Sequence, residues 1–165
     1  VRGLLYQAKR QDFGAALLTA IPLSNEQQLN EGFKLVTSFK KKKIGFLGLA
    51  FKGGTDDLRE SALVLLAERL LGKGYELLIY DRNVNLARIF GSNKAYIEKE
   101  IPHIEKLFAS SVAEVVHSSE VIIVGNDDPE YVGALKGIKD RQIVDLVRMT
   151  DNPSAQGANY HGICW

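Results

Sequence analysis

The sequence predicts an α/β fold in which a doubly wound parallel sheet follows an N-terminal helical arm. Residues 1–38 carry apolar side chains at helical spacing, and no strand-like run interrupts them. From Lys43 onward, short apolar runs alternate with amphipathic segments. That alternation is typical of parallel strands whose two faces are covered by crossover helices. Right-handed crossovers then give a Rossmann-like sheet.

The arm is predicted to form two helical segments or a helical hairpin. Apolar residues repeat at helical spacing over residues 4–17, and Pro22 then interrupts the pattern. Ser24-Asn25 is expected to cap a second helix that runs through Thr37. The basic run Lys40–Lys43 suits the solvated C-terminal end of that helix, because cations are favoured there.

The rest of the chain divides into predicted strands and the helices between them. Strands are expected over residues 44–51, 75–80, 120–124 and 142–147. Helices are expected over residues 61–71, 84–90, 94–101 and 112–117, and a further helix opens with Asp128 as its cap and Pro129 at its first position. The tail from residue 150 onward is polar and turn-rich until its last three residues.

Composition narrows the class of protein. Apolar residues make up 45% of the 165, and the formal net charge is +1. These values allow a sizeable core and argue against disorder and against an electrostatic nucleic-acid partner. No apolar run approaches the roughly 18 residues that span a bilayer, so no membrane partner is expected. The N-terminus has neither a signal-peptide pattern nor an initiator Met, and we expect it to be the cut end of a longer protein.

The single cysteine, Cys164, permits no intrachain disulfide, and a reducing, cytoplasmic location is therefore expected. Nothing near Cys164 provides the base that a nucleophilic thiol needs. We expect it to be a packed tail residue between Ile163 and Trp165, not a catalytic one. The histidines and carboxylates show no metal-ligand spacing, so no metal site is expected.

A charged loop, FKGGTDDLRES, follows the first predicted strand. In a doubly wound sheet, ligands gather beyond the carboxyl ends of the strands. Lys52 directly follows a buried strand, so it is suited to hold a fixed positive charge toward a phosphate or carboxylate. Arg59 is suited to the same task, with Asp56 and Asp57 holding the two cations. The residues alone are equally compatible with a solvent-exposed loop of self-compensating salt bridges.

Two nucleotide-binding motifs are absent from this loop. A dinucleotide fingerprint needs G-x-G-x-x-G in a tight turn that runs straight into a helix. Here Gly45 and Gly48 fall within the predicted strand, and Gly53-Gly54 come later, well before the helical pattern begins. No Gly-Lys-Ser/Thr completes a P-loop either. Asp81, at the end of the second strand, is therefore expected to cap the next turn instead of holding a ribose.

The same loop resembles the F-K-x-x-T-D-D-x-R-E-S signature of the nucleotide-sugar 6-dehydrogenases, the family of UDP-glucose and GDP-mannose dehydrogenases. The run YDRNVNLARIFGSNKAYIEKEIPH and the final GICW are similar to the GDP-mannose branch. The resemblance covers essentially the whole chain. Its first residues, VRGLLYQA, resemble the segment that directly follows the catalytic cysteine in this family.

The resemblance implies an NAD-dependent enzyme that oxidises a sugar C6 alcohol twice, to the uronic acid. It implies a central helical region over residues 1–40, which would form a homodimer through residues 1–38. Residues 41–165 would be the C-terminal nucleotide-sugar-binding domain. The NAD-binding N-terminal domain of the same enzyme would be its partner and would carry the nucleophile, so this chain alone would be inactive.

The family's site residues transfer onto three positions. Lys52 matches the lysine that contacts the nucleotide sugar, and Phe51 presents its backbone to the same GDP-sugar. Arg59 matches the arginine that reaches the cofactor NAD. Ala62 departs from the proline that the family often has there. The residues leave two alternatives open, which are a non-catalytic nucleotide-binding or dimerisation module and the equivalent part of a UDP-sugar dehydrogenase.

Overall fold

A computed structural model describes residues 1–84, 89, 91–150 and 157–163. Its sheet has five parallel strands in the order β2-β1-β3-β4-β5. The strands are β1 (Lys43–Leu47), β2 (Glu76–Tyr80), β3 (Val121–Val124), β4 (Gln142–Asp145) and β5 (Tyr160–Gly162). The helices are α1 (Arg2–Arg10), α2 (Ala16–Ser38), α3 (Ala62–Gly72), α4 (Gly91–Glu100), α5 (Val112–Ser118) and α6 (Pro129–Leu135), with a 3₁₀ turn, η2, at Ile104–Leu107.

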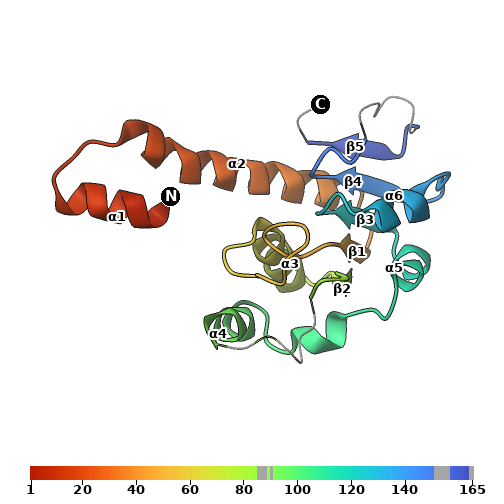
Figure 1. Cartoon of the computed structure of the whole chain (residues 1–165). Coiled ribbons are helices and arrows are strands. Elements are labelled where there is room, and N and C mark those ends of the chain that lie inside the picture. The colour runs from red at the N-terminus through yellow and green to blue at the C-terminus, as the bar shows by residue number, and fades with distance from the viewer. Residues whose placement is uncertain (85–88, 90, 151–156, 164–165) are drawn as a thin grey trace.

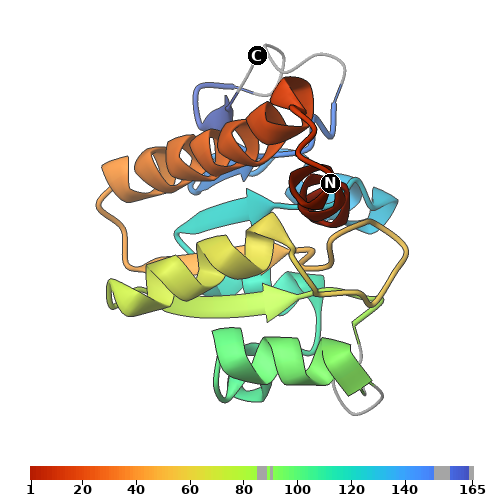
Figure 2. The ribbon, with the colours of Figure 1, turned by 90° about the vertical axis from the view of Figure 1, so that its left-hand side faces the viewer.

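Helices cover both faces of the sheet, which confirms the predicted doubly wound α/β class (Figures 1 and 2). Successive residues of β3 point to opposite faces, so Ile123 packs in the core under α2, α3 and α4, while Ile122 packs in the core under α5 and α6. Gly45 lets α5 lie close to β1, since a β-carbon there would come within 2.5 Å of Val115 Cγ1. Both cores contain side chains from the strands that the apolar runs predicted.

The arm extends away from the sheet, with α1 folded back along α2 (Figure 1). The expected break at Pro22 is wrong, because α2 continues through Pro22 to Ser38, and Ser24-Asn25 caps nothing. Pro22 costs the helix one hydrogen bond. Downstream, Val36 is fully buried, and Leu29 and Phe33 pack against the core, so tertiary contacts hold the helix on the far side of the proline.

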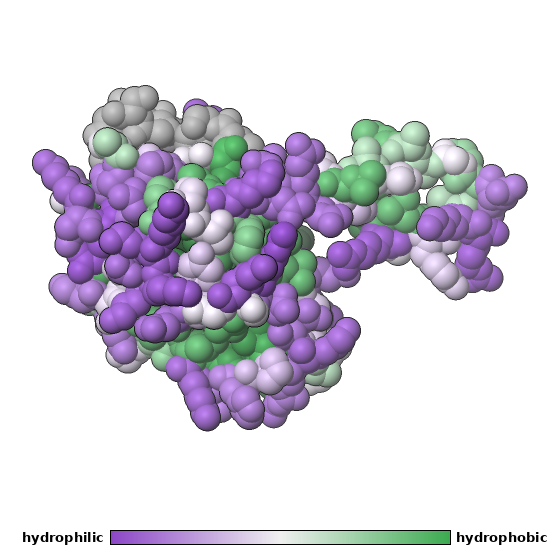
Figure 3. Space-filling model, turned by 180° about the vertical axis from the view of Figure 1, so that it is seen from behind, coloured by the Kyte–Doolittle hydropathy of each residue, from purple (hydrophilic) through white to green (hydrophobic). Residues whose placement is uncertain are grey.

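The outer part of the arm is apolar and uncovered. No residue of α1 is buried. Six large apolar residues of the arm are more than half exposed, namely Val1, Leu4, Tyr6, Phe13, Leu17 and Leu23. Figure 3 shows these hydrophobic surfaces on the projecting arm. Among the described residues, no helix is both long and apolar enough to cross a membrane.

Two predicted strands end earlier than their apolar runs do. The first was expected to reach Phe51, but β1 ends at Leu47 because Gly48 turns the chain with a φ of +88°. The fourth was expected to reach Val147, but β4 ends at Asp145. The Asp145 carboxylate is fully buried and accepts the backbone N–H groups of Val147 and Met149, which curls the chain into a loop.

The cap predicted at Asp128 is confirmed, and two serines cap helices in the same way. Ser61, Ser111 and Asp128 each accept a backbone N–H from the first turn of α3, α5 and α6, respectively. The expected helix over residues 84–90 falls mostly outside the described residues, and so do Cys164 and Trp165.

The tail forms a fifth strand that the sequence analysis missed. β5 pairs in parallel with β4, from Tyr160 opposite Ile143 to Gly162 opposite Asp145. The strand is short and polar, so it shows no apolar run. Side chains hold it instead. Tyr160 donates its hydroxyl to Asp145, and a ring nitrogen of His161 lies 2.8 Å from Gln142 Oε1. The His161 ring also packs on Phe39, with centroids 4.9 Å apart.

The position of His161 predicts a loss of stability in acid. Burial lowers the pKa of His161, while an unfolded histidine titrates near about 6.5. Below that pH the unfolded chain binds a proton that the folded chain resists, so the free energy of unfolding falls as pH drops from about 6.5 toward the lowered pKa. Urea unfolding at a series of pH values should show a shallower fall for His161→Gln. An unchanged fall in that variant would contradict the prediction.

Candidate functional site

The carboxyl edge of the sheet has its switch point between β1 and β3, where neighbouring strands send their connections to opposite faces. The chain leaves β1 toward α3 and leaves β3 toward α6. The two exits lie close together. A β-carbon on Gly48 would come within 2.6 Å of Asn126 Nδ2, and one on Gly125 within 2.3 Å of Leu63 Cδ1. Glycine at both positions therefore allows the loops to pack against each other.

A buried carboxylate, Asp81, closes this switch point from the end of β2. Its Oδ2 accepts the backbone N–H groups of Leu49 and Ala50 at 2.8 and 3.0 Å. Its Oδ1 accepts the N–H of Asn83 at 3.0 Å, as predicted for a residue that caps the next turn. Asp81 is 4% exposed. The amides that follow β1 are thus satisfied by the protein itself and are not directed at a phosphate.

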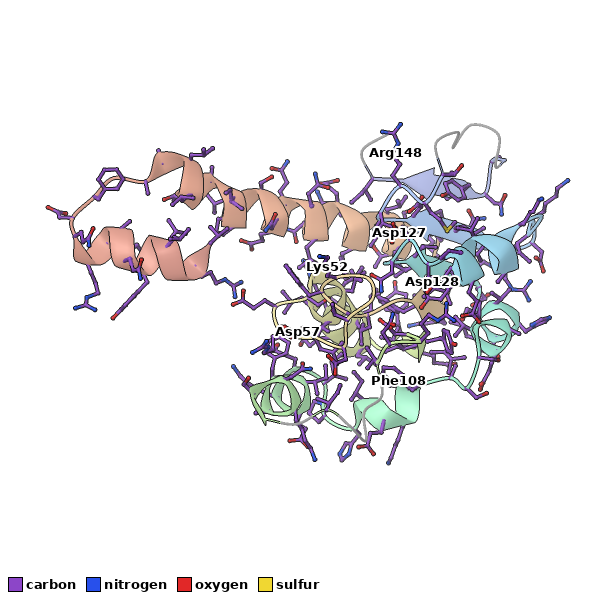
Figure 4. All side chains as sticks on the ribbon, in the orientation of Figure 1. Lys52, Asp57, Phe108, Asp127, Asp128 and Arg148 are labelled. Carbon is purple, nitrogen blue, oxygen red and sulfur yellow. The ribbon has the colours of Figure 1, made fainter. Side chains whose placement is uncertain are left out.

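The loop from Phe51 to Glu60, here called the motif loop, carries all three predicted site residues. Phe51 donates its N–H to the carbonyl of Asp57 at 2.8 Å, while its ring is 66% exposed. Lys52 accepts the N–H and hydroxyl of Thr55 at its carbonyl. Its exposed ammonium makes no hydrogen bond within the described part of the chain. Figure 4 shows Lys52 and Asp57 on this loop, between β1 and α3.

Arg59 is held by its own loop. Its Nε and NH2 donate to the two Asp57 carboxylate oxygens at 2.8 and 2.7 Å, and NH1 donates to Ser92 Oγ at 3.1 Å. The hydrogen bonds from Arg59 hold the pKa of the Asp57 carboxyl below its usual value, so the pair stays ionised near neutral pH. Asp57 therefore positions Arg59, as the sequence suggested. No such ion pair joins Asp56 to Lys52 among the described residues.

A cavity of about 760 Å³ lies between the arm and the motif loop. Phe51 and Ala62 line one side, Pro22 and Leu29 of α2 the other, and Val147 its end. An ion pair between Arg2 and Glu60, 2.7 Å long, joins the arm to the motif loop beside it. Ligand sites are typically mostly apolar clefts of about 300–1,000 Å³, with a few polar groups. The cavity has that size and character, and Lys52 directly follows Phe51 in the sequence.

Of the two acidic residues after β3, Asp128 has structural partners. Asp128 caps α6 and accepts Arg82 NH1 at 3.1 Å. Asp127 lines a pocket of about 170 Å³ together with Gly53 and Asn126. In the part of the chain that the structure describes, no histidine, cysteine and carboxylate group is arranged to hold a metal ion.

Comparison with known proteins shows which family this domain belongs to. Residues 45–152 match the model of the UDP-glucose/GDP-mannose dehydrogenase family, UDP binding domain. The chain belongs to this family. The matched residues run from β1 past β4 and include the whole motif loop, so the family match covers the switch point and every predicted site residue.

Individual relatives match the whole chain, including the arm. The chain is 46% identical to the GDP-mannose 6-dehydrogenase of Pseudomonas putida and 48% identical to that of Pseudomonas aeruginosa, in each case over its whole length. It spans 38% of the length of these relatives. A crystal structure of a ternary complex of the Pseudomonas aeruginosa GDP-mannose dehydrogenase superposes with a TM-score of 0.86 at 47% identity, covering 99% of this chain and 37% of that one.

A more distant structure shares the fold alone. The UDP-glucose dehydrogenase of Pyrobaculum islandicum superposes with a TM-score of 0.71 at 21% identity.

Two features of the site were missed by sequence reasoning. The first is the pair of hydrogen bonds that Asp81 accepts from the backbone after β1. The second is the contact of α4 with the motif loop. Both join residues far apart in the sequence. Only the position of Asp81 at the end of an apolar run pointed toward the first, and no pattern pointed toward the second.

Proposed function

We propose that this chain is the nucleotide-sugar-binding part of an NAD-dependent GDP-mannose 6-dehydrogenase. That enzyme would oxidise the C6 alcohol of the sugar twice, to the uronic acid. In this role the chain would supply Phe51 and Lys52 to the GDP-sugar and Arg59 to the cofactor. Residues 1–40 would be the helical dimerisation region and residues 41–165 the nucleotide-sugar-binding domain. The remaining groups for catalysis would come from a further domain of the same enzyme.

The observation that carries this proposal is the setting of Lys52. Its backbone follows a loop end fixed by Asp81 and comes directly after Phe51, which lines an apolar cavity of ligand size. Its ammonium makes no hydrogen bond within the described part of the chain. A nucleotide diphosphate offers both an apolar base and two anionic groups. A fixed cation beside an apolar cleft matches that combination. Phe51 adds an exposed aromatic residue to the lining of the same cavity.

In this proposal the chain would contact NAD through Arg59 and not through the backbone amides at the switch point of its own sheet. The Leu49 and Ala50 amides, which a dinucleotide phosphate would need, are already bonded to Asp81. Arg59 offers an exposed guanidinium that Asp57 holds in one orientation. In the family's reaction NAD accepts hydride from the sugar. Arg59 would stabilise its phosphate charge from across the cleft.

Calorimetric titration of the chain with GDP-mannose and UDP-glucose, each without NAD, tests the proposal. We expect preference for GDP-mannose and at least a roughly tenfold loss of affinity in Lys52→Ala, because a charge-assisted phosphate contact contributes about 1.5–3 kcal/mol. The matched control is Lys73→Ala, which removes the same charge from an exposed site beyond the end of α3. Equal affinity in Lys52→Ala and wild type would contradict the role of Lys52.

The exposed apolar arm supports a homodimer formed through residues 1–38. Leu17 is 79% exposed and Phe13 is 68% exposed, and both lie beyond the reach of the sheet's core. Burying such a surface against a second copy would be favourable. We expect the wild type to sediment as a dimer and Leu17→Glu as a monomer. Val132→Glu changes an exposed apolar residue of α6 and should leave the dimer intact. A monomeric wild type would refute this interface.

A further inference from the structure

The motif loop has no regular secondary structure to hold it. Its own backbone closes it into a ring, because Phe51 N–H donates to Asp57 O at 2.8 Å. Within the ring, the Lys52 carbonyl accepts from Thr55. One end of the ring is fixed to the end of β2, because Asp81 accepts the N–H of Ala50 just before the ring. The other end, around Asp57, needs a second point of attachment if the ring is to keep one conformation.

Asn93, near the start of α4, supplies that attachment. Its side-chain Oδ1 accepts the N–H of Leu58 at 3.0 Å, and its Nδ2 donates to the carbonyl of Asp56 at 2.8 Å. The two bonds lie on either side of Asp57, whose carbonyl holds Phe51. Ser92, the preceding residue, accepts Arg59 NH1 at 3.1 Å. Leu58 itself is fully buried, which fixes the backbone on the core side.

Asn93 contacts backbone atoms of the loop and is itself only partly buried. Its replacement therefore should not disturb the core, in contrast to a change at Leu58. The connection from Asn93 to Lys52 runs through one peptide group, that of Asp57, and then through Phe51. Freeing the ring at Asn93 would let Lys52 sample more positions before a ligand arrives, and ordering it again would reduce affinity.

We propose that Asn93 is a positioning residue of the nucleotide-sugar site. It holds the motif loop in the conformation that presents Lys52, and it touches no ligand itself. The inference rests on the proposed function, since it assumes that Lys52 contacts the diphosphate. It assigns to α4 a role in affinity, although α4 lies outside the cavity.

The test is a double-mutant cycle on the whole chain, with GDP and guanosine as probes and binding followed by NMR titration. Asn93→Ala should weaken GDP about five- to tenfold, as expected for one side chain that must be ordered on binding. Guanosine, which has no phosphate for Lys52 to reach, should change less than about twofold. In the Lys52→Ala background, Asn93→Ala should have no further effect on GDP.

Two controls sharpen the result. Asn93→Asp keeps an acceptor for Leu58 N–H and should recover part of the GDP affinity. Ser92→Ala removes only the contact to Arg59 and should bind GDP as the wild type does. Equal losses for GDP and guanosine, or additive effects with Lys52→Ala, would overturn the positioning role while leaving the proposed function standing. A wild type that binds no GDP would overturn both.

Discussion

Replacing Asp81 by alanine should destabilise the protein by about 4 kcal/mol, because it leaves buried backbone donors without acceptors. Leu49 and Ala50 are at most 1% exposed, and both donate to this carboxylate. Each buried donor left unpaired costs about 1–3 kcal/mol. A further N–H, that of Asn83, also loses its partner. Since total stability is about 5–15 kcal/mol, urea unfolding should show a large drop in midpoint.

Glu120 provides a matched control at the opposite edge of the sheet. Its Oε2 also accepts two successive backbone N–H groups, those of Lys42 and Lys43, at 3.1 and 3.2 Å. Those contacts are exposed, so water can replace the carboxylate. Glu120→Ala should therefore unfold close to the wild-type midpoint. Similar midpoints for Asp81→Ala and Glu120→Ala would show that burial does not decide the cost.

Gly125→Ala should destabilise by about 2–3 kcal/mol through steric overlap at the switch point. The new methyl group would lie 2.3 Å from Leu63 Cδ1 and 2.9 Å from the carbonyl oxygen of Gly48. The Gly48 carbonyl belongs to the backbone, so it cannot turn aside as the end of a side chain can. Overpacking of this kind typically costs about 1–3 kcal/mol. Thermal unfolding monitored by circular dichroism would measure the loss.

Gly133→Ala is the matched substitution in the same part of the chain. Gly133 lies inside α6, and a β-carbon there would meet nothing within 4 Å. Alanine in a helix interior is favoured over glycine by about 0.5–1 kcal/mol. This variant should therefore melt slightly above the wild type. A loss of stability as large as that of Gly125→Ala would contradict the steric explanation.

Local patterns were enough to predict most of the architecture. The apolar run before Gly48 predicts a buried strand, and Asp128 followed by Pro129 predicts a helix start, because each depends on neighbours in the sequence. The path of α2 through Pro22 could not be predicted, since it depends on packing against the sheet. The short strand β5 was not predicted for a similar reason, because its pairing depends on contacts with Asp145 and Gln142.

The candidate site also has residues that the sequence indicated and residues that it did not. The residue types of the motif loop pointed to Lys52 and Arg59, although they were equally compatible with a loop of self-compensating salt bridges. Phe51 was added only by the resemblance to the family signature. The groups that orient the loop did not stand out, because Asp81 and Asn93 act through backbone atoms of distant residues. Almost any residue type can donate a backbone N–H, so such a contact leaves no recognisable sequence pattern at the donor position.

The strand order has a consequence for how the chain assembles. β1 pairs with β2, which follows after one helix, but its other neighbour, β3, comes only after α4 and α5. Closing the longer loop costs more chain entropy, so the β1–β2 unit should form first. Until β3 docks, the inner edge of β1 is unpaired and prone to join another chain. A nascent or truncated chain that stops before Val121 would therefore be the aggregation-prone species, and binding of a chaperone should be strongest at that length.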